Sequence, residues 1–151
     1  MSLEEFKAID AKNLPLSKLI SIIARSNTIY INRHLEDLNI NSTQLELLFE
    51  ISRNNDINQE KIAAGCSIDK GAVARSIKKL EENGLVKREI DVNNRRQNKV
   101  SLTELGDETL EKSVRILEKW EDEVTSDVEK EMLKKVLKDI AVKTIEINNG
   151  E

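Results

Sequence analysis

The chain has 151 residues and a net charge of −4, and 38% of its residues are hydrophobic, 34% charged and 3% aromatic. This composition fits one domain, or one domain with an added dimerisation layer, around a core of Leu, Ile and Val. A single cysteine excludes an intrachain disulfide framework and fits a reducing, cytoplasmic setting, and we expect no signal peptide and no membrane span, since no stretch approaches ~18 apolar residues.

The first predicted element is a long amphipathic helix from about residue 15 to residue 38. Pro15 suits its first turn, and apolar residues follow at mixed three- and four-residue spacing. The resulting stripe is wider than one small domain needs. Its members are Leu16, Leu19, Ile20, Ile23, Tyr30, Ile31, Leu35 and Leu38.

A second helix of about three turns is expected next. Asn41 with Gln44, or Thr43 with Glu46, could each form its capping box, and the sequence does not decide between them. The residues expected on its inward face are Leu45, Leu48, Phe49 and Ser52.

Residues 57–84 predict a helix-turn-helix. A short helix begins after Asn58, and a turn follows through residues 65–67. Asp69 then caps a second helix, which ends at the left-handed stop formed by residues 83 and 84. The inward residues of this second helix are Val73, Ile77 and Leu80.

Two strand-like runs, LVKREID and KVSLT, enclose the polar, turn-forming VNNRRQN. A β-hairpin that follows a helix-turn-helix makes a winged helix. From Thr103 the chain reads as helical again, with a break at residues 125–127. The expected fold class is therefore mainly α (α+β): a winged helix-turn-helix with a two-stranded wing over residues 41–103, joined to N- and C-terminal helices.

Charge is unevenly distributed along the chain. Residues 57–103 carry a net charge of +4, whereas residues 1–56 carry −2 and residues 104–151 carry −6. A basic middle between acidic ends suggests a module that binds a polyanion.

Helical periodicity places small and basic residues on the outward face of the second helix of the helix-turn-helix. Arg75 has the reach to meet a guanine edge or a phosphate, and the lysines suit phosphates. The alternative interpretation is that these side chains only solvate an exposed face. The candidate DNA-binding residues here are Lys70, Gly71, Ala72, Arg75, Lys78 and Lys79.

Arg95 and Arg96 stand at the predicted tip of the hairpin. From there an arginine could enter the minor groove next to the recognition helix, where narrow A·T tracts concentrate negative potential. The alternative is a solvated, charged turn without a partner.

The stretch IDKGAVARSIKKLEENGLVKREIDVNNRRQNKVSLTELG resembles the multiple-antibiotic-resistance regulator (MarR) family of winged-helix transcription factors. The family pattern is a recognition helix, then Leu-x-x-x-Gly-Leu-Val, a wing with Asp-x-x-Asp-x-Arg, and Leu-Thr-x-x-Gly. The order of elements also agrees over residues 14–147. The corresponding residues are Leu80, Gly84, Leu85, Val86, Asp91, Asn94, Arg96, Leu102, Thr103 and Gly106.

The resemblance implies a homodimer on a pseudo-palindromic double-stranded-DNA operator, with one recognition helix per half-site. Residues 1–40 and 104–151 would form the dimerisation layer, in one compact chain rather than in independent domains. Arg96 would be the wing residue that enters the minor groove, and Asp91 would support the wing. Asn94 stands where the family has an aspartate, so the resemblance does not decide firmly between Arg95 and Arg96 as the residue that enters the minor groove.

The resemblance also implies a crevice for a small aromatic or phenolic effector, for which Arg25, Tyr30 and His34 are candidates, with core or surface roles as the alternative. Cys66 is expected to be a buried structural cysteine, and the alternative is a redox sensor whose pKa is lowered by nearby Lys70. No cofactor, metal cluster or catalytic motif is predicted. The expected function is a ligand-responsive regulator that acts as a repressor and not as an enzyme; the alternative is a winged-helix module that binds another protein.

Overall fold

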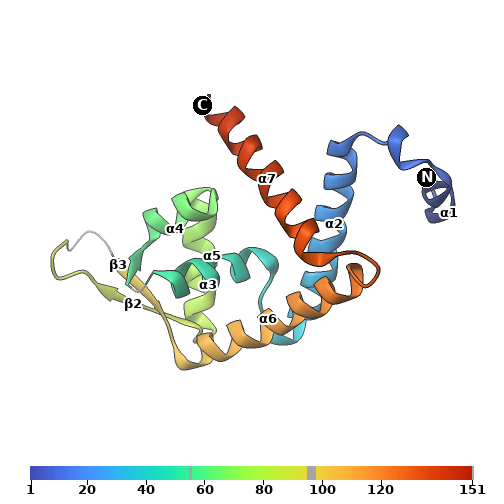
Figure 1. Cartoon of the computed structure of the whole chain (residues 1–151). Helices are drawn as coiled ribbons and strands as arrows, with labels where there is room; N and C mark the ends of the chain where they lie inside the picture. Colours follow the sequence, from blue (N-terminus) through green and yellow to red (C-terminus); the bar gives the residue numbers. More distant parts are fainter. Residues whose placement is uncertain (55, 95–97, 151) are drawn as a thin grey trace. The chain divides into compact units, whose positions relative to one another are not determined.

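The computed structural model describes residues 1–54, 56–94 and 98–150. In these residues the chain is mainly helical, with one small antiparallel sheet (Figure 1). It divides into two compact units, Met1–Ile116 and Leu117–Glu151. The fold class predicted from the sequence, a winged helix-turn-helix with helices before and after it, is confirmed.

The N-terminal part contains α1 (Leu3–Ala8), the short 3₁₀ turn η1 (Ala11–Asn13) and the long helix α2 (Leu16–Leu35), which continues as η2 (Glu36–Leu38). The predicted helix from about residue 15 to 38 is therefore confirmed, and its last turn is a 3₁₀ helix. The helix α1 was not anticipated from the sequence; it is a single short element that begins with a Ser2–Glu5 capping box.

The capping box of α3 (Ser42–Arg53) is the one formed by Asn41 and Gln44. The Asn41 side chain accepts the Gln44 N–H at 2.9 Å, and the Gln44 side chain accepts the Asn41 N–H at 3.0 Å. These two bonds satisfy backbone donors that the first helical turn leaves unpaired. The Thr43–Glu46 alternative is therefore wrong.

The inward face of α3 was predicted only in part. Leu45 and Leu48 are buried as expected, but Ser52 is exposed, and Leu47 and Ile51 are fully buried in its place. The reason is that α3 is the central helix, in contact with α2, α4, α5 and β3. A helix covered on several sides buries more than one stripe.

The helix-turn-helix consists of α4 (Gln59–Cys66) and α5 (Lys70–Glu82). The Asn58 side chain caps α4, and the Asp69 side chain accepts the Ala72 N–H at 3.0 Å to cap α5. The predicted turn begins later than expected, because α4 runs through Cys66 and reverses at Ser67, where φ is 53°.

The wing is formed by β2 (Val86–Ile90) and β3 (Asn98–Leu102), which pair antiparallel with Val86 opposite Leu102. A third strand, β1 (Ile57–Asn58), pairs with β3 on its other side and gives the order β1-β3-β2. The two-stranded wing is confirmed, and β1 attaches it to the start of the helix-turn-helix.

The core lies where α3, α4 and α5 meet the sheet. It is aliphatic, as the low aromatic content requires, and it fixes α5 and the wing on one scaffold. Its fully buried apolar side chains are Leu35, Leu47, Leu48, Ile51, Ile62, Val73, Ile77, Leu80 and Val100.

The second unit contains the last turns of α6 (Glu104–Val124) and the helix α7 (Lys130–Asn149). Lys130 joins the two, since its Nζ lies 3.0 Å from Glu121 and 2.6 Å from Asp122. The predicted break at residues 125–127 is confirmed. No residue in the described part of α7 is buried.

Candidate nucleic-acid interface

The helix α5 presents its small and basic residues to solvent, as its periodicity predicts. Gly71, Arg75, Lys78 and Lys79 are exposed, and Ala72 is half-buried, while Val73 on the opposite face is 1% exposed. The candidate DNA-binding residues on α5 therefore share an accessible face.

Two of the four cations on α5 have acidic neighbours. Lys70 lies 3.6 Å from Glu60, and Lys78 lies 3.9 Å from Glu82. Both are exposed pairs, which are weak and open readily to another anion. Across the described residues, Arg75 has no ion pair within 4.0 Å, so its guanidinium is available without breaking one.

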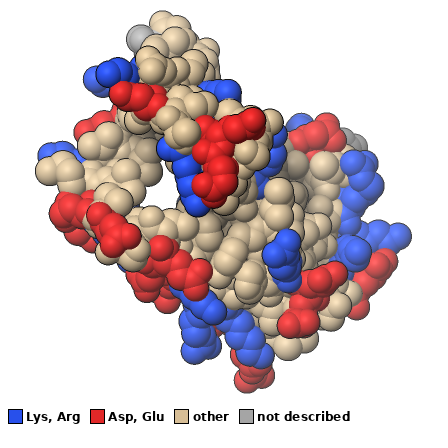
Figure 2. All heavy atoms as spheres, turned by 90° about the vertical axis from the view of Figure 1, so that its right-hand side faces the viewer, with Lys and Arg blue, Asp and Glu red and all other residues tan. Residues whose placement is uncertain are grey.

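Charges of both signs are interspersed on the molecular surface, as the face drawn in Figure 2 shows. A polyanion therefore finds cations at particular places on this chain rather than on a uniformly basic face. The exposed face of α5 is one such place, because Arg75 and Lys79 both reach solvent there.

At the wing, the predicted Arg95 and Arg96 lie outside the described residues. The residues before them are described, and Asp91 organises them: its Oδ1 accepts the Asn93 N–H at 2.9 Å. This is the local turn that an aspartate side chain favours. Lys99 on β3 lies 4.0 Å from the same carboxylate, so Asp91 ties the start of the turn to the opposite strand.

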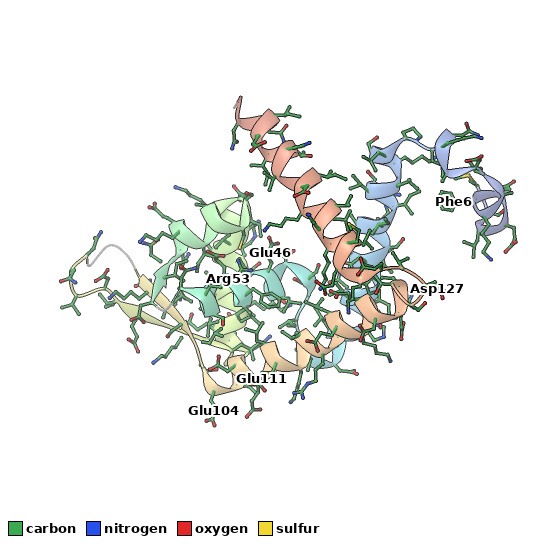
Figure 3. The ribbon with its side chains drawn as sticks, viewed as in Figure 1. Phe6, Glu46, Arg53, Glu104, Glu111 and Asp127 are labelled. Atoms are coloured by element: carbon green, nitrogen blue, oxygen red, sulfur yellow. The ribbon has the colours of Figure 1, made fainter. Side chains whose placement is uncertain are left out.

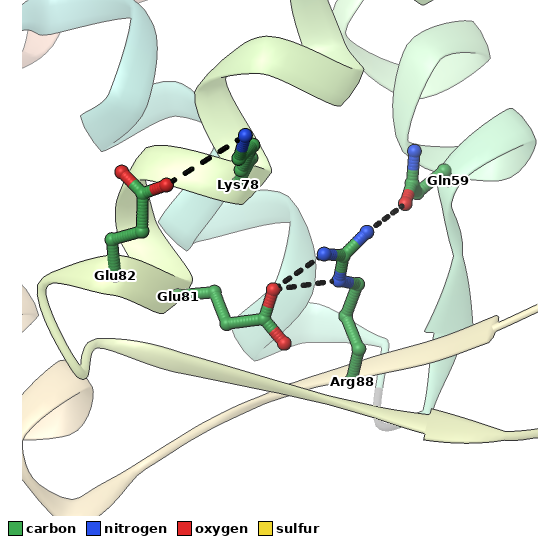
Figure 4. Close-up of polar contacts among 5 residues, drawn as sticks. All are labelled: Gln59, Lys78, Glu81, Glu82 and Arg88. Carbon is green, nitrogen blue, oxygen red and sulfur yellow. Dashed lines mark hydrogen bonds and ion pairs between the residues drawn. The ribbon is translucent and has the colours of Figure 1, made fainter.

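Sequence reasoning missed the residue that joins the wing to α5. Arg88 on β2 donates from Nε and Nη2 to one oxygen of Glu81 on α5, at 2.9 and 2.5 Å (Figure 4). Its Nη1 lies 3.5 Å from the Gln59 side-chain oxygen on α4. In the sequence, Arg88 is one of the cations of the basic segment 57–103. No local sequence pattern indicates this pair, because the two side chains meet only when β2 runs back along α5.

The three effector candidates lie on α2. Tyr30 and His34 stack with ring centroids 4.0 Å apart, and His34 Nδ1 lies 2.8 Å from the Tyr30 carbonyl oxygen. Arg25 is exposed one to two turns earlier. None of the three lines either of the two cavities found near the end of α2, which are bordered instead by residues such as Asn39 and Asn83. Their role in ligand binding stays a prediction.

Cys66 is buried at the end of α4 and lies against α3, the helix that carries Glu46 and Arg53 (Figure 3). Burial raises the pKa of the Cys66 thiol, and the charges of Glu46 and Glu50 raise it further. The lowering by Lys70 that the redox alternative required is therefore wrong. A thiol with a raised pKa is a poor nucleophile at neutral pH, which agrees with a structural cysteine.

Comparisons with known proteins place this arrangement in a family. The model of the MarR family matches residues 40–97. The uncharacterized HTH-type transcriptional regulator YdgJ of Bacillus subtilis (strain 168) is 31% identical over 112 residues, covering 74% of this chain and 68% of the relative. A crystal structure of MarR superposes with a TM-score of 0.83 at 32% identity, covering 95% of this chain and 99% of that structure.

The chain belongs to the MarR family.

A further relative of this MarR-family regulator, the HTH-type transcriptional regulator BilQ of Clostridium symbiosum (strain WAL-14163), is 27% identical over 116 residues, which cover 77% of the chain and 81% of the relative. The chain is thus a DNA-binding transcriptional regulator and not an enzyme. Among its described residues, no three His, Cys, Asp or Glu side chains are grouped to hold a metal ion. No helix in that part of the chain has the length and apolar character of a membrane span.

Proposed function

We propose that this MarR-family chain acts in the cytoplasm as a homodimeric repressor that binds a pseudo-palindromic operator. The exposed face of α5 enters the major groove, and the wing tip reaches the minor groove beside it. The residues assigned to DNA contact are Lys70, Gly71, Ala72, Arg75, Lys78, Lys79, Arg95 and Arg96.

The observation that carries this proposal is the face of α5 itself. Gly71 at its start has no side chain, and Arg75 one turn later is exposed and has no ion pair among the described side chains. A guanidinium in this position can form two hydrogen bonds to the O6 and N7 atoms of guanine. The lysines around it are better suited to phosphates, which position the helix without reading sequence.

The dimer is supported by apolar side chains that the single chain leaves in solvent. On α2, Leu16 is 57% exposed and Ile23 is 55% exposed, and on α7, Leu137 is 48% and Ile145 is 59% exposed. A row of exposed apolar residues on a long helix marks an interaction surface, and each of these two helices carries one. A second copy of the chain is the occupant we propose, since a twofold pair would present two α5 helices to two half-sites.

The experiment is selection of duplexes from a randomised library with the full-length protein. We expect enrichment of an inverted repeat whose half-site centres lie about one helical turn apart, or a multiple of it. Enrichment of a single unrepeated site would contradict the dimeric operator. No enrichment over the starting library would contradict operator binding and favour the alternative module that binds another protein.

We further propose that a small aromatic or phenolic effector relieves repression. The support comes from α2, where the stacked Tyr30 and His34 rings and the Arg25 cation could meet an aromatic ring and a carboxylate. Benzoate and phenol are suitable probes in titrations of the protein–duplex complex. Release by benzoate that is lost in Arg25→Ala supports this site, and equal release in both proteins contradicts it.

A further inference from the structure

We propose that Arg88 is a positioning residue whose ion pair with Glu81 sets the wing against the recognition helix α5. In this role Arg88 does not contact DNA, although it belongs to the most basic part of the chain. The inference rests on the proposed roles of α5 and the wing at the operator.

The first argument is the number of elements that meet at one guanidinium. Arg88 is the middle residue of β2, Glu81 lies in the last turn of α5, and Gln59 is the first residue of α4. Two N–H groups of Arg88 meet one Glu81 oxygen, and the third nitrogen faces Gln59 (Figure 4). Such a fork fixes direction as well as distance, which a single lysine contact does not.

The second argument is the side of the sheet on which Arg88 lies. Its partner in the ladder is Val100, which is 0% exposed. Residues directly opposite in a ladder share one face, so Arg88 is on the face that packs against the helices. By contrast, the neighbouring Lys87 and Glu89 pair with each other on the exposed face at 3.1 Å.

The third argument is burial. The side chains of Arg88 and Glu81 are 31% and 36% exposed, whereas those of Lys78 and Glu82, one helical turn apart on α5, are 70% and 62% exposed. The Arg88–Glu81 pair is thus less screened by water and salt than the Lys78–Glu82 pair. It is the stronger candidate for holding a geometry that DNA binding requires.

The two possible roles of Arg88 predict opposite signs for Glu81→Gln. If Arg88 contacted a phosphate, removing the Glu81 carboxylate would free the guanidinium and tighten binding to a polyanion. If Arg88 positions the wing, the same substitution loosens the wing and weakens binding. Glu82→Gln is the matched control, because it removes the same charge from the adjacent residue and leaves Arg88 paired.

The experiment measures duplex affinity, and its dependence on salt, on the sequence enriched by the native full-length protein. We expect Glu81→Gln and Arg88→Gln each to weaken binding about tenfold, and the double variant to be no weaker than the singles, as for two residues in contact. The slope of log K against log salt should fall by about 1 or more in each, because a displaced wing no longer brings the cations Arg95 and Arg96 to the DNA. Glu82→Gln should bind at least as tightly as the native chain.

Rescue separates positioning from a general loss of folding. The charge-reversed pair Glu81→Arg with Arg88→Glu should regain most of the lost affinity, and thermal unfolding of each variant reports its fold. Tighter binding by Glu81→Gln, or additive losses in the double variant, would overturn the inference while leaving the proposed function intact. Failure of the native protein to select any duplex would overturn the proposed function, and the inference with it.

Discussion

Gly106 on α6 faces the carbonyl oxygen of Leu85 so closely that a Cβ on Gly106 would overlap that oxygen. Thr103 completes the junction, because its N–H donates to the Leu85 carbonyl at 3.1 Å and its Oγ1 accepts the Gly106 N–H at 3.0 Å. The glycine is needed here for close approach of two backbones and not for its conformational freedom.

Gly106→Ala is therefore expected to destabilise the fold by about 1–3 kcal/mol, since the added methyl group must move the backbone after α5. Urea unfolding at a fixed protein concentration measures this change. Glu108→Ala, an exposed substitution two residues further along α6, is the control and should stay within about 0.5 kcal/mol of the native chain. Equal stability of the two variants would show that the junction is not tight in solution.

The apolar face of α7 is expected to hold the dimer together. Leu137 is exposed in the single chain, and Leu137→Glu places a charge in the proposed interface. Because a twofold interface contains the substitution twice, we expect the dissociation constant to rise by more than tenfold. Analytical ultracentrifugation over a concentration series measures it. Lys135 lies on roughly the opposite face of the helix, so the dimer of the Lys135→Glu variant should dissociate like that of the native chain. A native dissociation constant in Leu137→Glu would exclude this face of α7 from the interface.

Cys66 is expected to be unreactive in the folded protein. Since burial raises its pKa, iodoacetamide at pH 8 should alkylate it at least about tenfold more slowly than in the urea-unfolded chain, because the thiolate is the reactive form. Mass spectrometry follows the modification. Mild peroxide should affect duplex binding equally in the native chain and in Cys66→Ser. Peroxide-driven release that Cys66→Ser abolishes would restore the redox alternative.

The stability of the turn between α6 and α7 is expected to fall at acid pH, when Glu121 becomes protonated. Hydrogen bonds from Lys134 and then Lys130 lower the pKa of this carboxyl. A group whose pKa is lower in the folded chain than in the unfolded chain stabilises the fold above the ordinary glutamate range, and this contribution is lost as pH falls through its lowered pKa. Carboxyl NMR titration should show the pKa of Glu121 rising in Lys134→Gln but not in Lys138→Gln. The same pKa in all three proteins would contradict the contact.

The helix-turn-helix could be predicted closely because its boundaries are set by local chemistry. Asp69 caps α5 through a contact three residues away, and Gly84 ends it with φ of 73°, which glycine adopts freely. Each of these signals depends only on residues that are close together in the sequence. The helical periodicity of Val73 and Ile77 then suffices to assign the outward face, and with it the DNA-binding candidates on α5.

The contacts that the sequence did not reveal are those between distant segments. The strand β1 is two residues long and is a strand only because β3 comes to lie beside it. The Arg88–Glu81 pair likewise requires β2 to return along α5. The buried face of α3 was misassigned for the same reason, since which of its residues are covered depends on four neighbouring elements.

The central claim, that the outward face of α5 reads base sequence, is tested most directly by comparing Arg75→Ala with Lys79→Ala on the selected duplex and on duplexes changed at single positions. We expect Arg75→Ala to lose about 1–3 kcal/mol of discrimination at one base pair of each half-site. Lys79→Ala should weaken binding to all duplexes alike and reduce the salt slope by about 1. Native discrimination at every base pair in Arg75→Ala would contradict the account.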